Sequence, residues 1–356
     1  MNLHKKIHHI TIQQDQTLLA ALKQMDSIKR KLLIVFSGDE FINILSAGDI
    51  QRAIINNLPL TGLVSTVLKK NPILATSEDT LEEVKLAMLS ERIEFMPVVD
   101  SNREIIDVLF WEEVFGSVEK RPVPKLDLPV VIMAGGLGKR LLPLTNVIPK
   151  PLIPIGEKTI VEEIMDRFID VGCDSFLMSV NYKAETIKQY FDQCNFKYKI
   201  LYFQEDKPLG TAGSISLLKK SIKNTFFVSN CDIIINEDYS EILKYHQENG
   251  NSMTIVSALK HIYIPYGTIE TGSDGIVQSF IEKPELTFQV NSGLYILEPT
   301  ILDFIPENTF FQMNQLVDIV MENNGKVGVF PVSEGSWIDI GEWDGYIKLL
   351  NLTSTC

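Results

Sequence analysis

From Val130 onward, short apolar runs alternate with segments of helical periodicity. The runs include VVIM, SFLMSV and TFFVSNCDIII, and helical patterns at 160–171 and 184–191 lie between them. Strands that are apolar on both faces and joined by helices fit a mostly parallel sheet covered on two sides. The sequence therefore predicts a Rossmann-like α/β domain over 130–356, with its ligand at the carboxyl ends of the strands.

The first third of the chain contains an internal repeat. TIQQDQTLLAALKQM and LATSEDTLEEVKLAM align at a constant offset of 63, which matches Thr17 with Thr80. Each copy has the pattern of a strand end, a threonine cap and an amphipathic helix, followed by two short strands and a second helix. This β-α-β-β-α repeat resembles the paired CBS module, a regulatory domain that often binds adenosine nucleotides. We expect a CBS pair at 1–118, with repeats at about 8–60 and 70–117.

Composition limits the partners and the compartment. A chain of 356 residues with 45% hydrophobic and 22% charged content fits two globular domains, and three prolines mark a linker at 119–129. The net charge of −13 argues against a general nucleic-acid surface. Four cysteines without a CxxC pair favour a reduced, cytoplasmic protein, and no run of about 18 apolar residues suggests a membrane helix. We expect a homo-oligomer with small-molecule substrates.

A glycine cluster follows the first apolar run, in MAGGLGKRL. A P-loop would need glycine at position 133 and serine or threonine at 140, where Met133 and Arg140 stand. A dinucleotide fingerprint would need a glycine in place of Leu141. Taken alone, the cluster fits a tight turn as well as it fits an anion-binding loop.

The longer segment AGGLGKRLLPLTNVIPKPL resembles the signature of the sugar nucleotidyltransferases. These enzymes join a nucleoside triphosphate to a sugar 1-phosphate and release pyrophosphate. The resemblance implies that backbone N–H groups of Gly135, Gly136 and Gly138 approach the triphosphate, while Arg140 and Lys150 neutralise its charge.

Later motifs of the same family follow in order, from EDKPLGTAG and NCD to YGTIE, EKP, VNSGLYIL and WIDIGEWDGY. The resemblance implies base recognition by the first, with Glu205, Gly210 and Thr211. It implies a sugar pocket formed by Gly267, Glu282 and Asn291, with Lys283 on the sugar phosphate. It also implies a magnesium site at Asp232 and Asp339.

The chemistry explains why these residue types suffice. A phosphate oxygen is already a nucleophile, so catalysis consists of positioning and charge neutralisation, here by Arg140, Lys150 and Lys283. Mg²⁺ uses one or two carboxylates plus substrate phosphates. Two positions depart from the family pattern, Lys139 in place of threonine or serine and Cys231 in place of glycine.

The sequence constrains the base of the triphosphate and the identity of the sugar 1-phosphate less closely than it constrains the reaction. Glu205 resembles the guanylyltransferases more than the glutamine-bearing uridylyl and thymidylyl enzymes, and its carboxylate can accept from guanine N–H groups, which favours GTP. The arrangement of a CBS pair before a transferase resembles the glucosamine-1-phosphate guanylyltransferases of legionaminic acid synthesis. Mannose 1-phosphate and heptose 1-phosphate remain open, as do uridylyl or thymidylyl transfer and a catalytically silent scaffold.

The CBS resemblance implies an effector site at Ser46 and Asp49, where a hydroxyl would contact phosphate and a carboxylate the ribose. The second repeat has Phe110 and Glu113 at the matching positions, so at most one site is expected. The alternative is that Ser46 and Asp49 only cap the following helix.

Overall fold

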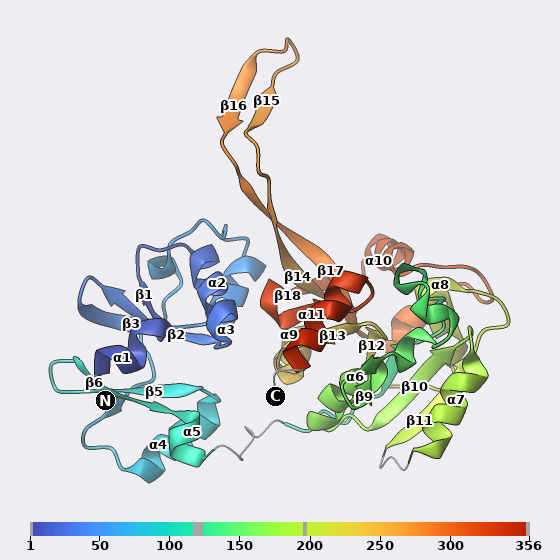
Figure 1. The fold of residues 1–356 in the computed structure, drawn as a ribbon, viewed down its shortest axis with the longest axis horizontal. Coiled ribbons are helices and arrows are strands. Elements are labelled where there is room, and N and C mark those ends of the chain that lie inside the picture. Colours follow the sequence, from blue (N-terminus) through green and yellow to red (C-terminus); the bar gives the residue numbers. More distant parts are fainter. Residues whose placement is uncertain (1–2, 117–123, 195–197, 354–356) are drawn as a thin grey trace. The chain divides into compact units, whose positions relative to one another are not determined.

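The structure is a computed structural model that describes residues 3–116, 124–194 and 198–353 (Figure 1). The chain forms two compact units, Met1–Val123 and Pro124–Cys356. Part of the expected linker, 119–123, lies outside the described residues. Its remainder belongs to the second unit, because the Leu126 N–H donates to the Val171 carbonyl at 2.9 Å.

The first unit contains the repeat that the sequence predicts. Short helix α1 (Leu3–Ile7) precedes it. The first copy is β1 (Thr11–Gln13), α2 (Leu18–Ile28), β2 (Leu32–Ser37), β3 (Glu40–Ser46) and α3 (Ala47–Ile55). The second is β4 (Ala75–Thr76), α4 (Leu81–Glu91), β5 (Phe95–Val99), β6 (Ile105–Phe110) and α5 (Trp111–Phe115). Each copy forms a three-stranded sheet with one parallel and one antiparallel pairing.

Threonine caps start the first helix of each copy, as predicted. Thr17 Oγ1 accepts from the Ala20 N–H at 3.1 Å, and Thr80 forms a capping box with Glu83. The two sheets share one apolar core that includes Ile34 and Phe95, both fully buried. The repeat is therefore confirmed in both its elements and its caps.

The second unit is built on a seven-stranded sheet in the order β11-β10-β7-β12-β17-β14-β18. Its strands are β7 (Val130–Met133), β10 (Ser175–Val180), β11 (Lys199–Gln204), β12 (Phe226–Asn230), β14 (Met253–Tyr263), β17 (Glu285–Leu297) and β18 (Val327–Val332). The pairings among β11, β10, β7 and β12 are parallel, and β17 is antiparallel to both of its neighbours. The predicted mostly parallel α/β sheet is confirmed.

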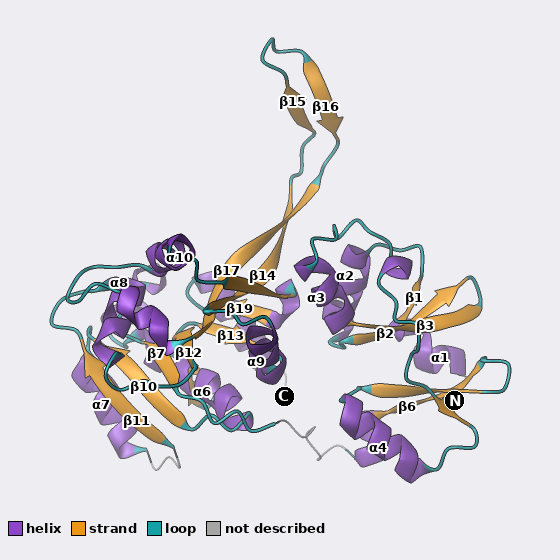
Figure 2. Ribbon diagram, turned by 180° about the vertical axis from the view of Figure 1, so that it is seen from behind, coloured by secondary structure: helices purple, strands orange, loops and turns teal. Residues whose placement is uncertain are grey.

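Helices cover both faces of this sheet (Figure 2). They are α6 (Ile160–Asp170), α7 (Ala184–Gln193), α8 (Gly210–Gly213), α9 (Tyr239–Glu248), α10 (Met313–Glu322) and α11 (Trp343–Thr353). Successive residues of β7 point to opposite faces, so Val130 and Ile132 join one core and Val131 joins the other. That alternation explains why the strand has no polar side.

Three smaller pairs complete the second unit. They are β8 (Pro154–Ile155) with β9 (Lys158–Thr159), β13 (Ile233–Ile235) with β19 (Trp337–Asp339), and β15 (Thr268–Thr271) with β16 (Val277–Ile281). The apolar run TFFVSNCDIII is thus two strands, β12 and β13, with a turn at Cys231 and Asp232 between them. This turn takes the chain out of the large sheet at Asp232 and into the pairing of β13 with β19.

The outer halves of β14 and β17 leave the sheet as a two-stranded ribbon. Pairing with β18 ends at Ala258, whereas pairing between β14 and β17 continues to Tyr263 and Glu285. We call residues 259–289, which include β15 and β16, the arm. It projects away from the body of the second unit (Figures 1 and 2). Among the described helices, none combines the length and apolar character needed to cross a bilayer.

Candidate active site

The glycine loop after β7 combines one strained glycine with one open glycine. Gly138 has φ +64°, and a Cβ there would lie 2.7 Å from Thr145 Cγ2, so this position requires glycine. Thr145 Oγ1 donates to the Gly138 carbonyl at 3.0 Å and closes the loop. A Cβ on Gly136 would meet nothing within 4 Å, so its backbone is open to a close approach by a ligand.

Asp232 and Asp339 converge from the two strands of the small β13–β19 sheet. Ile233 pairs with Asp339, and the Ile340 N–H donates to the Asp232 carbonyl at 2.8 Å. A Cβ added to Gly341 would lie 2.8 Å from Asp232 Oδ2 and 2.8 Å from Asp339 Oδ1. The absence of a side chain at this glycine therefore leaves a space that both carboxylates border.

Both predicted loop cations reach this carboxylate pair. Lys150 is 8% exposed, and its ammonium donates to Asp232 Oδ2. The Arg140 guanidinium lies 3.7 Å from Asp232 Oδ2 and 3.9 Å from Asp339 Oδ2. The structure therefore brings together Arg140, Lys150, Asp232 and Asp339, although 82 residues of chain separate Lys150 from Asp232.

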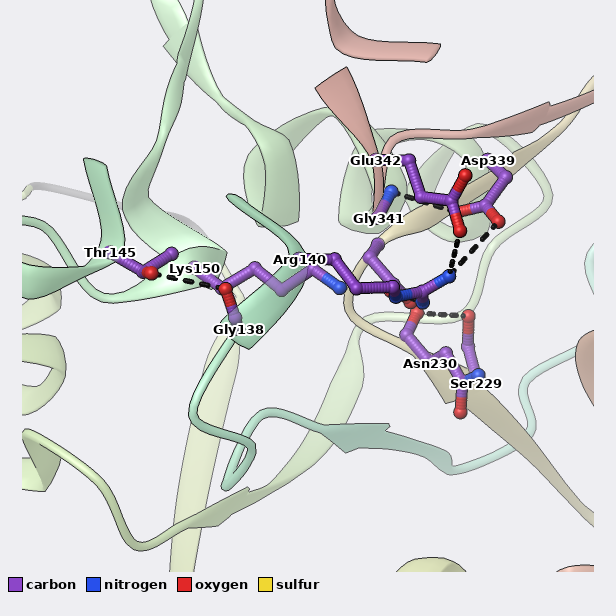
Figure 3. Close-up of polar contacts among 10 residues, drawn as sticks. Gly138, Arg140, Thr145, Lys150, Ser229, Asn230, Asp339, Gly341 and Glu342 are labelled. Atoms are coloured by element: carbon purple, nitrogen blue, oxygen red, sulfur yellow. Dashed lines mark hydrogen bonds and ion pairs between the residues drawn. The ribbon is translucent and has the colours of Figure 1, made fainter. Parts of the chain in front are cut away.

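Glu342 is a further member of this cluster that sequence reasoning missed. Its Oε1 accepts from Arg140 Nη1 at 2.8 Å, and Figure 3 shows Arg140 reaching toward Glu342 and Asp339 beside Gly341. This hydrogen bond, chiefly, raises the pKa of Arg140 above its usual value. The sequence signal that could have identified Glu342 is its position three residues after Asp339.

The donor set fits a magnesium ion. Asp232 and Asp339 offer hard carboxylate oxygens on one space, and Mg²⁺ in phosphoryl chemistry commonly takes one or two carboxylates and completes its shell with phosphates and water. Within the described part of the chain, no group of three His, Cys, Asp or Glu side chains is arranged to hold a metal by itself.

Glu205 lies buried beneath the glycine loop. A Cβ on Gly135 would be 3.3 Å from its Oε1, which also accepts from Ser179 Oγ at 3.0 Å. The Leu209 N–H donates to Oε2 at 2.7 Å. A carboxylate has about four lone-pair sites, so acceptor capacity remains for a ligand.

Gly210 and Thr211, which follow Glu205, pack against the segment that leads into α10. Gly210 has φ +80°, and a Cβ there would lie 2.7 Å from the Phe311 carbonyl oxygen. Thr211 Oγ1 accepts from the Met313 N–H at 2.9 Å, at the start of α10. Asn181, which sequence reasoning missed, donates through Nδ2 to the Glu205 carbonyl at 3.0 Å.

The predicted sugar residues divide between the sheet and the arm. Asn291 in β17 accepts from the Gly293 N–H and donates to Tyr295 Oη at 2.6 Å. Gly267 and Glu282 face each other on the arm, where a Cβ on Gly267 would lie 3.0 Å from Glu282 Oε2. Lys283 is exposed, and no hydrogen bond or ion pair joins it to any described residue.

The two departures from the family pattern have structural explanations. Burial raises the pKa of Cys231 to about 12, so its thiol stays protonated at neutral pH and packs in the core. Lys139 is exposed in a short 3₁₀ turn.

In the first unit, Ser46 and Asp49 form the capping box of α3. Ser46 Oγ accepts from the Asp49 N–H, and Asp49 Oδ2 accepts from the Ser46 N–H at 2.9 Å. Asp49 also pairs with Arg52 and, at 3.6 Å, with Lys69. The capping role is therefore present, and two cations lie at the same carboxylate.

The matching residues of the second repeat, Phe110 and Glu113, contact cations of the same unit. Lys6 Nζ and Arg30 Cζ lie 5.6 Å and 5.5 Å from the centroid of the Phe110 ring. Lys6 also pairs with Glu113 at 3.0 Å. Cations of the protein itself thus contact both Phe110 and Glu113.

Comparison with known proteins identifies the family. A family model described as Nucleotidyl transferase matches residues 129–355, more than half of the chain. This chain belongs to the nucleotidyl transferase family. A CBS domain model matches residues 64–118.

Similar proteins and structures extend this result. Mannose-1-phosphate guanyltransferases of Kluyveromyces lactis and Schizosaccharomyces pombe are 32% and 31% identical, over 60% and 64% of this chain. The matched region spans only 61% and 64% of the length of these relatives. The crystal structure of HddC from Yersinia pseudotuberculosis, also solved in complex with GMP-PN, is 30% identical with a TM-score of 0.51. That match covers 63% of this chain and 99% of HddC.

The pairing of Arg140 with Glu342 leads to a binding prediction. If Arg140 binds a nucleoside triphosphate as predicted, Glu342 competes with the phosphates for the guanidinium, and Glu342→Gln should tighten triphosphate binding about 2- to 5-fold, the scale of an exposed ion pair. Calorimetric titration with GTP measures the change. Asp344→Asn, which removes a nearby exposed charge that does not pair with Arg140, is the matched control. Weaker binding in Glu342→Gln alone would contradict this interpretation.

Proposed function

We propose that this chain transfers a nucleotidyl group from GTP to a sugar 1-phosphate and releases pyrophosphate. The observation that carries the proposal is the convergence of Asp232 and Asp339 around Gly341, with Arg140 and Lys150 bound to the same carboxylates. This cluster of carboxylates and cations lies next to an open glycine loop at the carboxyl end of β7, where parallel sheets bind ligands.

The reaction forms one bond and breaks one. An oxygen of the sugar phosphate bonds to the α-phosphorus while the bond from that phosphorus to the bridging oxygen breaks, and pyrophosphate leaves. Both substrates are anions, so the contribution of Arg140 and Lys150 is to neutralise charge and hold the triphosphate in line. A magnesium ion held by Asp232 and Asp339 would add positive charge on the phosphate oxygens.

Several observations favour guanine as the base. Glu205 is buried beside Gly135, where its carboxylate can accept from guanine N–H groups. The relatives named above are guanyltransferases, and the HddC complex contains GMP-PN. For the sugar, the names of these relatives favour mannose 1-phosphate. Glucosamine 1-phosphate, the substrate implied by the resemblance to legionaminic acid enzymes, is the second candidate.

A silent scaffold is the alternative of another class. Such a protein would have no reason to keep both carboxylates, both loop cations and an unobstructed Gly136 together. Their joint presence supports an enzyme, and its triphosphate substrate is consistent with a cytoplasmic location.

The metal role predicts a large loss on removing one carboxylate charge. Asp339→Asn should lower turnover with GTP and a sugar 1-phosphate at least ~100-fold, the scale of losing one preorganised electrostatic contact. Its melting temperature should change little, because an asparagine oxygen can still accept from the Gly341 N–H. Asp232 is a poorer choice, since its loss would also leave buried Lys150 unpaired.

The control for this experiment is again Asp344→Asn, which should keep normal turnover. Near-normal turnover of Asp339→Asn at saturating magnesium would contradict the metal assignment.

The base proposal predicts a change of specificity in Glu205→Gln. Replacing a charged acceptor by an amide should weaken GTP relative to UTP by ~1–3 kcal/mol, because one guanine N–H loses its acceptor. The readout is the ratio of kcat/KM for the two triphosphates. An unchanged ratio in a folded variant would show that the base is recognised elsewhere.

For the first unit, taken as the predicted CBS pair, we propose one adenosine nucleotide per chain, bound at Ser46 and Asp49. The cations beside Asp49, Arg52 and Lys69, support phosphate binding there. The second repeat, whose matching residues already contact cations of the same unit, supports a single site. Calorimetry of the full chain with AMP should give one site, and Asp49→Ala should abolish it while costing ~1 kcal/mol of stability from the lost cap.

Glu113→Ala is the matched control for this titration, because it alters the equivalent position of the second repeat. It should leave one AMP site. No heat from AMP, or two sites per chain, would contradict the proposal.

A further inference from the structure

Both predicted cations of the active site lie on one loop. We call the segment from Gly138 to Lys150 the cation loop, since it carries both of them. In its middle, Leu142 and Val147 are 46% and 77% exposed. Packing contributes little at these two positions, so hydrogen bonds to the loop decide how firmly it is held there.

Side chains from two helical segments hold the cation loop by its backbone. Lys183, the residue before α7, donates through Nζ to the carbonyl of Asn146 at 2.6 Å and to the carbonyl of Val147 at 2.8 Å. These two carbonyls end a 3₁₀ turn of the loop, a place that favours a cation. From α11, Trp343 Nε1 donates to the carbonyl of Leu142 at 3.2 Å. The loop is therefore fastened on both sides of its exposed middle.

Thr145 links the Lys183 contact to the glycine loop. It is 1% exposed, its carbonyl accepts from Tyr182 Oη at 3.5 Å, and its Oγ1 donates to the Gly138 carbonyl at 3.0 Å. A Cβ on Gly138 would lie 3.2 Å from Lys150 Cβ. This packed group of residues directly precedes, along the chain, the carbonyls that Lys183 binds.

The backbone of Lys183 gives a second reason to assign a role to its side chain. Its φ is +53°, in the left-handed region where glycine is the least strained residue. Within the described part of the chain, its side chain does not cap α7, although it stands at the position before that helix. The two bonds to the cation loop, and not the helix, therefore explain a lysine at this position.

We propose that Lys183 is a positioning residue, which fixes the cation loop so that both of its cations face the triphosphate. The inference rests on the proposed function, because it takes the ligand of the loop to be a nucleoside triphosphate. A loop that is ordered before binding loses less conformational entropy when the ligand arrives, so the affinity is higher. Lys183 acts through the carbonyls of Asn146 and Val147 and needs no contact with the substrate.

Calorimetric titration of the full chain with GTP tests this role. Lys183→Met, which keeps the length of the side chain but removes the amine, should raise the dissociation constant about 10-fold, the scale of losing a hydrogen bond from a charged group. Lys188→Met is the matched control, because it removes a lysine of α7 that pairs with Glu185 and not with the loop. It should leave the constant within about 2-fold, as expected for an exposed pair.

Lys183→Gly separates positioning from folding. Glycine suits the left-handed backbone, so this variant should melt no lower than the wild type. It should nevertheless bind GTP as weakly as Lys183→Met, and in steady-state assays the KM for GTP should rise while the KM for the sugar 1-phosphate stays unchanged.

Rescue by a restored amine completes the test. Lys183→Cys, alkylated with 2-bromoethylamine, carries a thioether that ends in an amine at nearly the length of lysine, and it should recover most of the GTP affinity. Wild type treated in the same way controls for the native cysteines. Wild-type affinity in Lys183→Gly, or no recovery after alkylation, would overturn the positioning role. A wild type that binds no GTP would instead refute the proposed function, on which the inference rests.

Discussion

The buried ion pair between Lys150 and Asp232 is the contact on which the active site depends. Lys150 follows the glycine loop, and Asp232 lies in the turn between β12 and β13. Their side chains are only 9% and 11% exposed. The backbone carbonyl of Asp232 also accepts from the N–H of Ile340, next to Asp339, so this one residue connects the loop, the large sheet and the small sheet. Removing either partner would leave a buried charge without compensation, which is strongly destabilising.

Two ion pairs hold the cations of the site in position. Lys150 is held in place by Asp232, and Arg140 by Glu342, so neither cation has to be ordered when substrate binds. Glu342 is the more exposed partner and the weaker restraint, and it can release Arg140 to a phosphate. A bound metal would take over part of the charge of Asp232.

Much of the fold could be predicted from the sequence, because hydrophobic runs and repeats are visible in short stretches of sequence. The apolar runs predicted the parallel sheet and the offset of 63 predicted the repeat. The family motifs pointed to Asp232 and Asp339, whose metal role stays a prediction. Glu342 and Asn181 were missed, since their roles depend on neighbours distant in sequence. The arm was missed for another reason. Its apolar residues have the pattern of buried strands, and a sequence pattern records which residues are apolar but not what covers them. The placement of Lys283 on a substrate therefore stays a prediction.

The predicted effector site in the first unit illustrates a different limit. Ser46 and Asp49 cap a helix in the structure, and a cap does not prevent the same side chains from binding a nucleotide. Regulation further requires that the nucleotide bind the more active and less active states with different affinity.

Nucleotidyl transfer at the Asp232–Asp339 site is the activity that connects the fold, the carboxylates and the loop cations. The most direct measurement incubates the full chain and magnesium with GTP, ATP, UTP or dTTP, each labelled at the α-phosphate, and with mannose or glucosamine 1-phosphate. We predict that the label of GTP enters a nucleotide sugar, with one pyrophosphate released for each product formed. Folded protein that transfers no label from any triphosphate to either sugar, or one that transfers label from UTP in preference to GTP, would contradict the account.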